Sequence, residues 1–167
     1  KARANHWDYW VCYNVDEQFM QRTGVTYYKG MDVADVSVLS FDIETTALYP
    51  KNGEVVLISN TFKSGGTVQT KLFAIDDYKT DKEMIHAWCE YVRTINPSVL
   101  VGHNIYGFDL PFLKSRAGKL PIGRDGSDAI FASRASRFRR DGSQTYDFNN
   151  VLVHGREIVD TFFLAIK

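Results

Sequence analysis

The sequence has little cysteine: Cys12 and Cys89 are the two thiols among 167 residues. They stand far apart and in no metal-ligand spacing, which excludes a disulfide-built fold and a cysteine zinc site. We therefore expect free thiols and a reducing, intracellular compartment. No run is long and apolar enough to span a membrane, and no signal peptide is visible, so no membrane partner is expected.

An excess of charge of either sign is also lacking. Lysine and arginine together number 20, aspartate and glutamate also number 20, and the formal net charge is zero. Proteins that bind nucleic acid by broad attraction are basic, so such binding here requires a local patch or metal ions. Hydrophobic residues make up 44% of the chain, enough for one domain with a short appendage. The chain begins without methionine and stops at Lys167 inside an apolar run, so we expect it to be a piece of something longer.

Residues 36–46 are the stretch around which the rest is organised. An apolar, β-branched run predicts a buried strand, and it leads into Asp42 and Glu44, two positions apart. Side chains on a strand repeat every two residues, so both acids leave the same face. Neighbouring carboxylates repel each other and lose hydration when buried, which a divalent cation compensates best. The alternative is an edge strand with two solvated acids, or a turn that starts at Asp42.

Residues 1–35 form an aromatic-rich segment ahead of the main domain, which we place at residues 36–167 and expect to be incomplete at its C-terminal end. Asn14 with Glu17 resembles a capping box and predicts a short helix over residues 15–23. We expect the aromatic side chains to pack on the main domain or a neighbouring one rather than to form a ligand surface. They are His6, Trp7, Tyr9, Trp10, Tyr13, Tyr27 and Tyr28.

The next elements predict a mixed sheet. Residues 54–62 and 67–75 predict strands that form an antiparallel meander with the first strand. Thr80 and Glu83 form a capping box ahead of an apolar stripe with three- and four-residue spacing, which predicts a long helix. Residues 99–104 predict a short buried strand, and the strand–helix–strand order favours parallel pairing with the first strand.

Asp109 opens another helix at the edge where the parallel strands end, and ligand sites of open α/β sheets gather at that edge. With Asp42 and Glu44 it gives three carboxylates without a histidine or cysteine partner, a set that suits Mg²⁺ or Mn²⁺. Two such ions about 4 Å apart activate water and stabilise the leaving oxygen of a phosphodiester. The alternative for Asp109 is that it simply caps its helix. For His103 we expect a structural or substrate-contact role rather than that of a general base.

Residues 130–153 predict a β-hairpin around Asp141–Gly142, and residues 155–161 predict a strand end followed by a helix that Asp160 caps. Basic residues interleave with aromatic ones on the hairpin, which suits a single strand of nucleic acid, because cations meet phosphates and rings stack on bases. The alternative, weighed equally, is an exposed, solubilising hairpin. The residues concerned are Arg134, Arg137, Phe138, Arg139, Arg140, Tyr146 and Phe148.

Three stretches resemble the exonuclease domain of family B DNA polymerases. Residues 41–45, Phe-Asp-Ile-Glu-Thr, are similar to its first exonuclease motif. Residues 104–113, in which Asn104 precedes Phe-Asp and an apolar helix start, are similar to the second, and residues 155–160 to the stretch after the family's hairpin. The resemblance covers about residues 27–167. It implies an α/β, RNase H-like (DnaQ-like) fold, with a mixed sheet of three antiparallel strands plus parallel strands, flanked by helices, and an inserted β-hairpin.

The resemblance also implies an activity and residue roles. The family removes nucleotides from a DNA 3′ end as monophosphates, using two Mg²⁺ or Mn²⁺ ions. By carry-over, Asp42 bridges both ions, Glu44 binds the water-activating ion and Asp109 holds the second ion. Asn104 and Phe108 are expected near the substrate strand. The hairpin matches, by position, the one that helps to move a primer end, and its substrate-binding candidates are Arg137, Arg139 and Arg140.

The implied partners are a single-stranded DNA 3′ end (the primer terminus) and the rest of a polymerase chain, in the cytoplasm of a prokaryotic or viral replication system. The family's third motif, a tyrosine followed by a final aspartate, is absent, and Asp160 does not match that aspartate. We therefore expect this chain to bind metal weakly and to cleave slowly or not at all. Two alternatives stay open: a non-catalytic nucleic-acid-binding or scaffold domain of the same fold, and a stand-alone DnaQ-like nuclease.

Overall fold

The structure is a computed structural model, and the residues that it describes are 12–26, 29–140 and 144–165. For Arg140 and Gln144 the backbone alone is described. None of the described helices is long and apolar enough to cross a lipid bilayer.

The chain divides into two compact units, and the first, residues 1–33, contains helix α1 (Val15–Thr23). The Asn14 side chain accepts hydrogen bonds from two backbone N–H groups of the first turn, at 2.8 and 3.3 Å, and a left-handed glycine ends the helix. The predicted helix is thereby confirmed. Apart from Tyr13, the predicted aromatic residues lie outside the described part of the chain: His6, Trp7, Tyr9, Trp10, Tyr27 and Tyr28.

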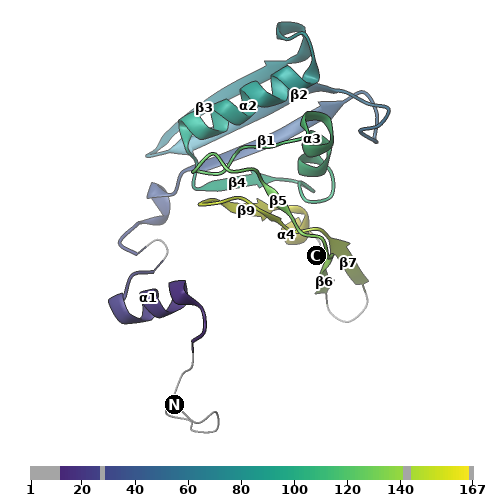
Figure 1. The fold of residues 1–167 in the computed structure, drawn as a ribbon. Coiled ribbons are helices and arrows are strands. Elements are labelled where there is room, and N and C mark those ends of the chain that lie inside the picture. The colour runs from purple at the N-terminus through teal and green to yellow at the C-terminus, as the bar shows by residue number, and fades with distance from the viewer. Residues whose placement is uncertain (1–11, 27–28, 141–143, 166–167) are drawn as a thin grey trace. The chain divides into compact units, whose positions relative to one another are not determined.

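The second unit, residues 34–167, is built on a five-stranded sheet in the order β3-β2-β1-β4-β9 (Figure 1). The pairings β3–β2 and β2–β1 are antiparallel, whereas β1–β4 and β4–β9 are parallel. This arrangement confirms the predicted meander and the parallel fourth strand. The strands are β1 (Val38–Thr45), β2 (Val55–Ser64), β3 (Thr67–Ala74), β4 (Val99–Gly102) and β9 (Glu157–Asp160), and short 3₁₀ helices occur at η1 (Val33–Asp35) and η2 (Ile75–Asp77).

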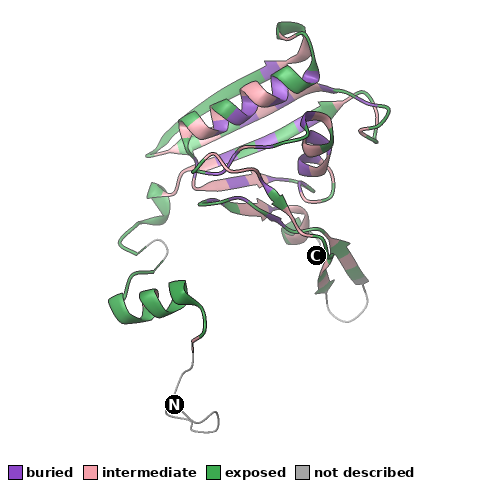
Figure 2. Ribbon diagram, viewed as in Figure 1, coloured by how far each residue is buried: buried purple, intermediate pink, exposed green. Residues whose placement is uncertain are grey.

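Helix α2 (Asp81–Ile95) covers one face of the sheet, and the side that it turns to the sheet is buried (Figure 2). Thr80 caps it as predicted, with its Oγ1 accepting a first-turn N–H at 3.2 Å. Trp88 is fully buried, lies 5.0 Å from the Phe41 ring between centroids, and donates from Nε1 to the Asn60 Oδ1 at 2.9 Å. Each large apolar side chain buried in this way stabilises the fold by about 1.5–3 kcal/mol.

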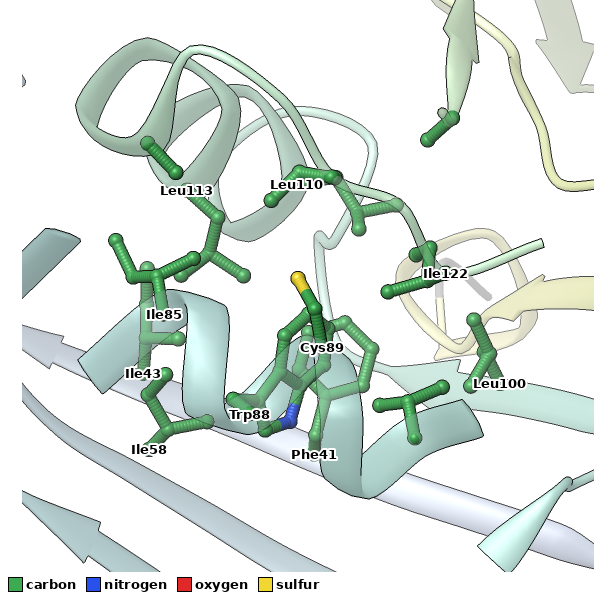
Figure 3. Close-up of a cluster of buried hydrophobic side chains, with 14 of the residues drawn as sticks. Phe41, Ile43, Ile58, Ile85, Trp88, Cys89, Leu100, Leu110, Leu113 and Ile122 are labelled. Atoms are coloured by element: carbon green, nitrogen blue, oxygen red, sulfur yellow. The ribbon is translucent and has the colours of Figure 1, made fainter. Parts of the chain in front are cut away.

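Helix α3 (Asp109–Ala117) lies beside α2 and contributes to the same core (Figure 3). Its Leu110 and Leu113 are fully buried in the cluster that includes side chains of α2 and β1. The two helices are also joined by a bidentate ion pair, because Arg116 donates to both carboxylate oxygens of Asp81 at 2.6 and 3.1 Å. This packing fixes the start of α3 relative to the sheet.

The predicted hairpin of residues 130–153 is confirmed and consists of two short ladders. Its predicted turn, Asp141–Gly142, lies outside the described residues. In the ladders, β5 (Ile130–Phe131) pairs with β8 (Val151–Leu152), and β6 (Ser136–Arg140) pairs with β7 (Gln144–Phe148).

The aromatic side of the hairpin packs on the last described helix, α4 (Phe162–Ala165). Ring centroids lie between 4.6 and 5.6 Å apart in the three contacts that join the two elements. The hairpin rings are Phe138, Tyr146 and Phe148, and their partners are Phe162 and Phe163. These rings therefore pack the hairpin against its own domain. The sequence pattern alone did not distinguish this role from stacking on bases.

Candidate active site

Asp42 and Glu44 lie on the face of β1 that points away from the α2–α3 core. The residues that alternate with them, Leu39, Phe41 and Ile43, are at most 5% exposed. The predicted common face of the two acids is therefore confirmed. The alternative of an edge strand is wrong, because β1 pairs with β2 on one side and β4 on the other, and the strand continues past Asp42 without a turn.

Strand β1 extends beyond its parallel partner at the carboxyl edge of the sheet. Pairing with β4 stops at Ser40, whereas β1 continues to Thr45. Beyond the paired part, the Ile43 N–H donates to Oδ1 of Asp109 at 3.2 Å. The N-cap of α3 is Phe108 and makes no side-chain capping bond. The Asp109 carboxylate bridges to β1 as well as bonding its own first-turn N–H, so it does more than cap its helix.

Asp109 is 2% exposed, and the nearby negative charge of Asp42 adds to the cost of its ionisation. Burial first, and then the charge of Asp42, raise the pKa of its carboxyl from an ordinary 3.8 to about 7, while the Ile43 N–H acts in the opposite direction. The structure thus brings Asp42 close enough for its charge to raise the pKa of Asp109. A cation at this edge relieves the repulsion between them.

Glu44 shares the exposed face of Asp42. Within the described ranges, however, no group of three or more histidine, cysteine, aspartate or glutamate side chains is close enough to hold a metal ion. The donor chemistry still fits Mg²⁺ or Mn²⁺, because the candidates are all carboxylates and the buried one has a raised pKa. Glu44 is exposed, and exposed side chains change rotamer in nanoseconds, so its distance from the other two is adjustable.

The loop between β4 and α3 carries Asn104 and Phe108. Asn104 is exposed and has a left-handed φ of 61°, and its carbonyl accepts the N–H groups of Gly107 and Phe108 at 3.0 and 2.8 Å. A Cβ at Gly107 would lie 2.4 Å from the Asn104 Oδ1, so a larger residue there would displace the Asn104 side chain. Phe108 is half-buried, with its ring centroid 5.5 Å from that of Phe112. Both residues that we predicted to contact substrate therefore belong to the loop that leads to Asp109.

Asp160 has contacts that the sequence did not reveal. We predicted it as a helix cap, and its Oδ1 does accept from the Phe162 N–H at 3.0 Å. The same carboxylate also accepts the N–H groups of Asn104 at 2.7 Å and Tyr106 at 3.0 Å. These contacts follow from the parallel pairing of β9 with β4, which places the ends of both strands side by side. The one sequence signal that could have suggested them was a predicted strand that ends in an acid.

Arg137 and Arg139 lie on the exposed side of the ladder, opposite Phe138. Arg137 donates from Nε to Asp147 at 2.8 Å, in an ion pair across the two strands. Arg139 is exposed, and the side chain of Arg140 lies outside what the structure describes. Contact of these arginines with a nucleic acid stays a prediction.

Comparison with known proteins places this geometry in a family. The family described as DNA polymerase family B, exonuclease domain, matches residues 10–165. The chain belongs to that family. A DNA polymerase from Pyrococcus glycovorans is 35% identical over 107 residues, which are 56% of this chain and 14% of the relative. The DNA polymerase delta catalytic subunit of Dictyostelium discoideum is 27% identical over 152 residues, 76% of this chain and 14% of the relative.

A solved structure resembles this exonuclease-family chain as well. The family B DNA polymerase from the hyperthermophilic archaeon Pyrobaculum calidifontis matches with a TM-score of 0.54 and 25% identity, over 76% of this chain and 15% of that one. These findings confirm the resemblance drawn from the three motifs and the predicted mixed α/β fold. The chain spans only 14–15% of the length of these relatives.

Proposed function

We propose that this chain carries a 3′–5′ proofreading exonuclease site, which hydrolyses the terminal phosphodiester of a single-stranded DNA 3′ end and releases nucleoside monophosphates. The observation that carries the proposal is the buried carboxyl of Asp109, held against β1 and close to Asp42. It lies at the carboxyl edge of the parallel strands, where open α/β sheets bind ligands. Membership of the exonuclease-domain family supports the reaction class.

The residues proposed to hold Mg²⁺ or Mn²⁺ are Asp42, Glu44 and Asp109. When bound, two such ions supply an activated water and stabilise the leaving oxygen of the phosphodiester. The chain itself contributes acceptor-only oxygens at one sheet edge, on a rigid central strand and at a helix start. Because Asp109 is withdrawn from water, a cation rather than solvent is left to balance its charge.

Substrate contact is proposed for the loop residues Asn104 and Phe108 and for the exposed side of the hairpin. The Asn104 amide suits hydrogen bonding at the strand end, and an aromatic ring such as that of Phe108 suits stacking on a base. The net charge of zero provides no broad attraction, so a local set of cations has to contact phosphates. That set is Arg137, Arg139 and Arg140. The further partner proposed is the remainder of a family B polymerase.

A second candidate is a domain that binds DNA ends without cutting them. It is favoured by one observation, namely that the described residues contain no ready group of three metal-binding side chains. The two candidates differ in whether the acids bind a cation and whether a nucleotide is released.

Calorimetric titration with Mn²⁺ tests the metal site. We expect the Asp42→Ala variant to bind Mn²⁺ at least about tenfold more weakly than wild type, in line with the effect of disturbing metal-site residues elsewhere. Asp76→Ala is the matched control, because Asp76 is an exposed acid on η2, distant in sequence from the site. Equal affinities for all three proteins count against the metal site.

A 5′-labelled single-stranded oligonucleotide then separates the two candidate functions. Stepwise shortening from the 3′ end in Mn²⁺, lost in Asp42→Ala and kept in Asp76→Ala, supports the exonuclease. Binding of the oligonucleotide without any shortening, equal in all three proteins, supports the non-cutting domain.

A further inference from the structure

The carboxylate of Asp160 joins three separate backbone positions. Asp160 ends β9, is 6% exposed, and accepts the N–H groups of Asn104, Tyr106 and Phe162 at 2.7, 3.0 and 3.0 Å. Two of these donors belong to the loop after β4, some 55 residues earlier in the chain. An ionised carboxylate suits this position because it is acceptor-only and has lone pairs for several N–H groups.

The neighbouring residue strengthens the same junction. The Thr161 N–H and Oγ1 both donate to the Gly102 carbonyl, at 2.9 and 3.1 Å, and Nδ1 of His103 lies 3.2 Å from that Oγ1. The Tyr106 hydroxyl donates to the Ile158 carbonyl at 3.2 Å. The end of β9 therefore holds the loop after β4 along its first half, and His103 has the structural contact expected for it.

A continuous set of hydrogen bonds leads from this junction to Asp109. The Asn104 carbonyl accepts the Phe108 N–H at 2.8 Å, and the Ile105 carbonyl accepts the Leu110 N–H at 3.0 Å. Asn104 has to keep a left-handed φ of 61° for this turn to form, a conformation that residues other than glycine rarely adopt. Fixing the Asn104 N–H therefore also fixes the direction in which α3 starts.

We propose that Asp160 is a positioning residue of the site: by binding the amides of Asn104 and Tyr106 it holds the loop that sets Asp109 against β1, next to Asp42. The inference rests on the proposed function for its catalytic meaning, but its geometric content is independent of metal or substrate. Asp160 is not itself a metal ligand in this proposal, since its oxygens are already occupied by three N–H groups.

The competing explanation is that Asp160 only caps α4. A cap explains the bond to Phe162, and losing it would affect a four-residue helix at the end of the described chain. It does not explain the bonds to Asn104 and Tyr106. The two explanations differ in what happens at Ile43, whose N–H donates to Asp109 on the far side of the loop.

Amide NMR of the ¹⁵N-labelled chain reads that difference directly. In Asp160→Ala we expect the Ile43 amide to exchange with solvent about fivefold faster, the ratio that corresponds to one net hydrogen bond, and to shift toward its frequency in Asp109→Ala. Asp160→Asn keeps an oxygen for Asn104 but turns an NH₂ group toward the Tyr106 N–H. We expect it to change the exchange rate and frequency of the Ile43 amide in the same direction but by less. It serves as the test variant if the alanine protein does not fold.

Asp125→Asn is the matched control, because Asp125 also accepts a loop amide, that of Ser127 at 2.9 Å, but in a different loop. Its Ile43 amide is expected to match wild type. An Ile43 amide that keeps its frequency and exchange rate in both Asp160 variants, while the amides of Asn104 and Tyr106 change, would overturn the proposal.

Mn²⁺ titration of the same proteins separates this inference from the proposed function. Weaker Mn²⁺ binding by Asp160→Ala, together with the change at Ile43, supports both. If wild type binds no Mn²⁺, the metal chemistry fails, and the Ile43 amide alone still decides whether Asp160 positions Asp109.

Discussion

Asp81 and Asp109 both occupy the first residue of a helix, and both are nearly inaccessible to solvent, at 5% and 2% exposure. Asp81 receives a bidentate guanidinium from Arg116 and the Val55 N–H at 3.2 Å. Burial acts to raise its pKa, but these hydrogen bonds outweigh it, and the pKa of Asp81 is lowered. Asp109 accepts the Ile43 N–H at 3.2 Å and its own backbone N–H, but it also faces the negative charge of Asp42, and its pKa rises to about 7.

The two pKa shifts distinguish Asp81, whose charge is balanced within the fold, from Asp109, whose charge is not. A buried charge that is paired and hydrogen-bonded is tolerated, whereas one placed near a like charge is unfavourable unless a ligand compensates it. Strongly raised carboxyl pKa values of this kind cluster at functional sites. We therefore assign the α2–α3 junction around Asp81 to the scaffold, and the β1 edge around Asp109 to the proposed site.

Removing Arg116, the cation that pairs with Asp81, should cause the largest loss of unfolding free energy. Arg116→Ala leaves Asp81 buried and unpaired, and we expect unfolding free energy to fall by about 3–5 kcal/mol at neutral pH. Urea denaturation followed by circular dichroism measures it. Arg116→Lys keeps the charge but loses the bidentate geometry, so its loss should be smaller. A neutral effect of the alanine change would contradict the assignment of this pair to the scaffold.

Removing the charge of Asp109 is expected to raise the unfolding free energy instead of lowering it. The folded-state pKa of Asp109 lies above its ordinary value, so this group favours the folded state below pH 3.8 and loses that contribution as pH rises through about 7. Asp109→Asn keeps an oxygen for the Ile43 N–H and removes the charge. In metal-free buffer above pH 7 it should therefore be more stable than wild type, by up to about 4 kcal/mol.

Thermal unfolding in a chelator at several pH values checks this sign. The gain should shrink as pH falls from 8 to 5, because wild-type Asp109 is then protonated. A gain that is the same at every pH would show that something other than ionisation is responsible. Arg116→Ala supplies the contrast in sign, since it should lower stability, whereas Asp109→Asn should raise it.

The common face of Asp42 and Glu44 was predictable because the two-residue repeat of a strand is local. Asp109 was also placed correctly, since a strand–helix–strand order leaves few choices for where the next helix begins. The pairing of Asp81 with Arg116 was not, because the partners are 35 residues apart on two helices whose relative rotation the sequence does not specify. The same holds for Asp160, whose loop contacts depend on the left-handed turn at Asn104.

On the hairpin, the alternation of Arg137, Phe138 and Arg139 indicated two different sides. It did not indicate what each side contacts. The structure shows rings against Phe163 and an ion pair from Arg137 to Asp147, both set by cross-strand and tertiary neighbours that no local pattern contains.

Replacing Asp81 should lower the unfolding free energy by less than replacing its partner Arg116. Asp81→Asn removes the charge that Arg116 pairs with most closely, but Arg116 is 26% exposed and keeps the Glu54 carboxylate at 4.0 Å, so we expect a loss of about 1–2 kcal/mol at pH 7. The folded-state pKa of Asp81 is lowered, so its contribution is present above its ordinary pKa and is lost as pH falls below that value. Asp81→Asn should therefore flatten the acid side of the stability profile, which thermal unfolding between pH 3 and 7 measures.

Arg137 and Asp147 form a second arginine–aspartate pair, but this one is exposed to solvent. Surface pairs contribute little, so Arg137→Gln should leave the melting temperature unchanged, in contrast to Arg116→Ala.

If Arg137 instead contacts phosphate in a complex, it has to leave Asp147, and the cost of leaving an exposed partner is small. Arg137→Gln should then weaken single-stranded DNA binding and reduce the slope of log K against log salt by about 1. Fluorescence anisotropy at several salt concentrations measures that slope, and an unchanged slope would restrict the arginine to its pair with Asp147.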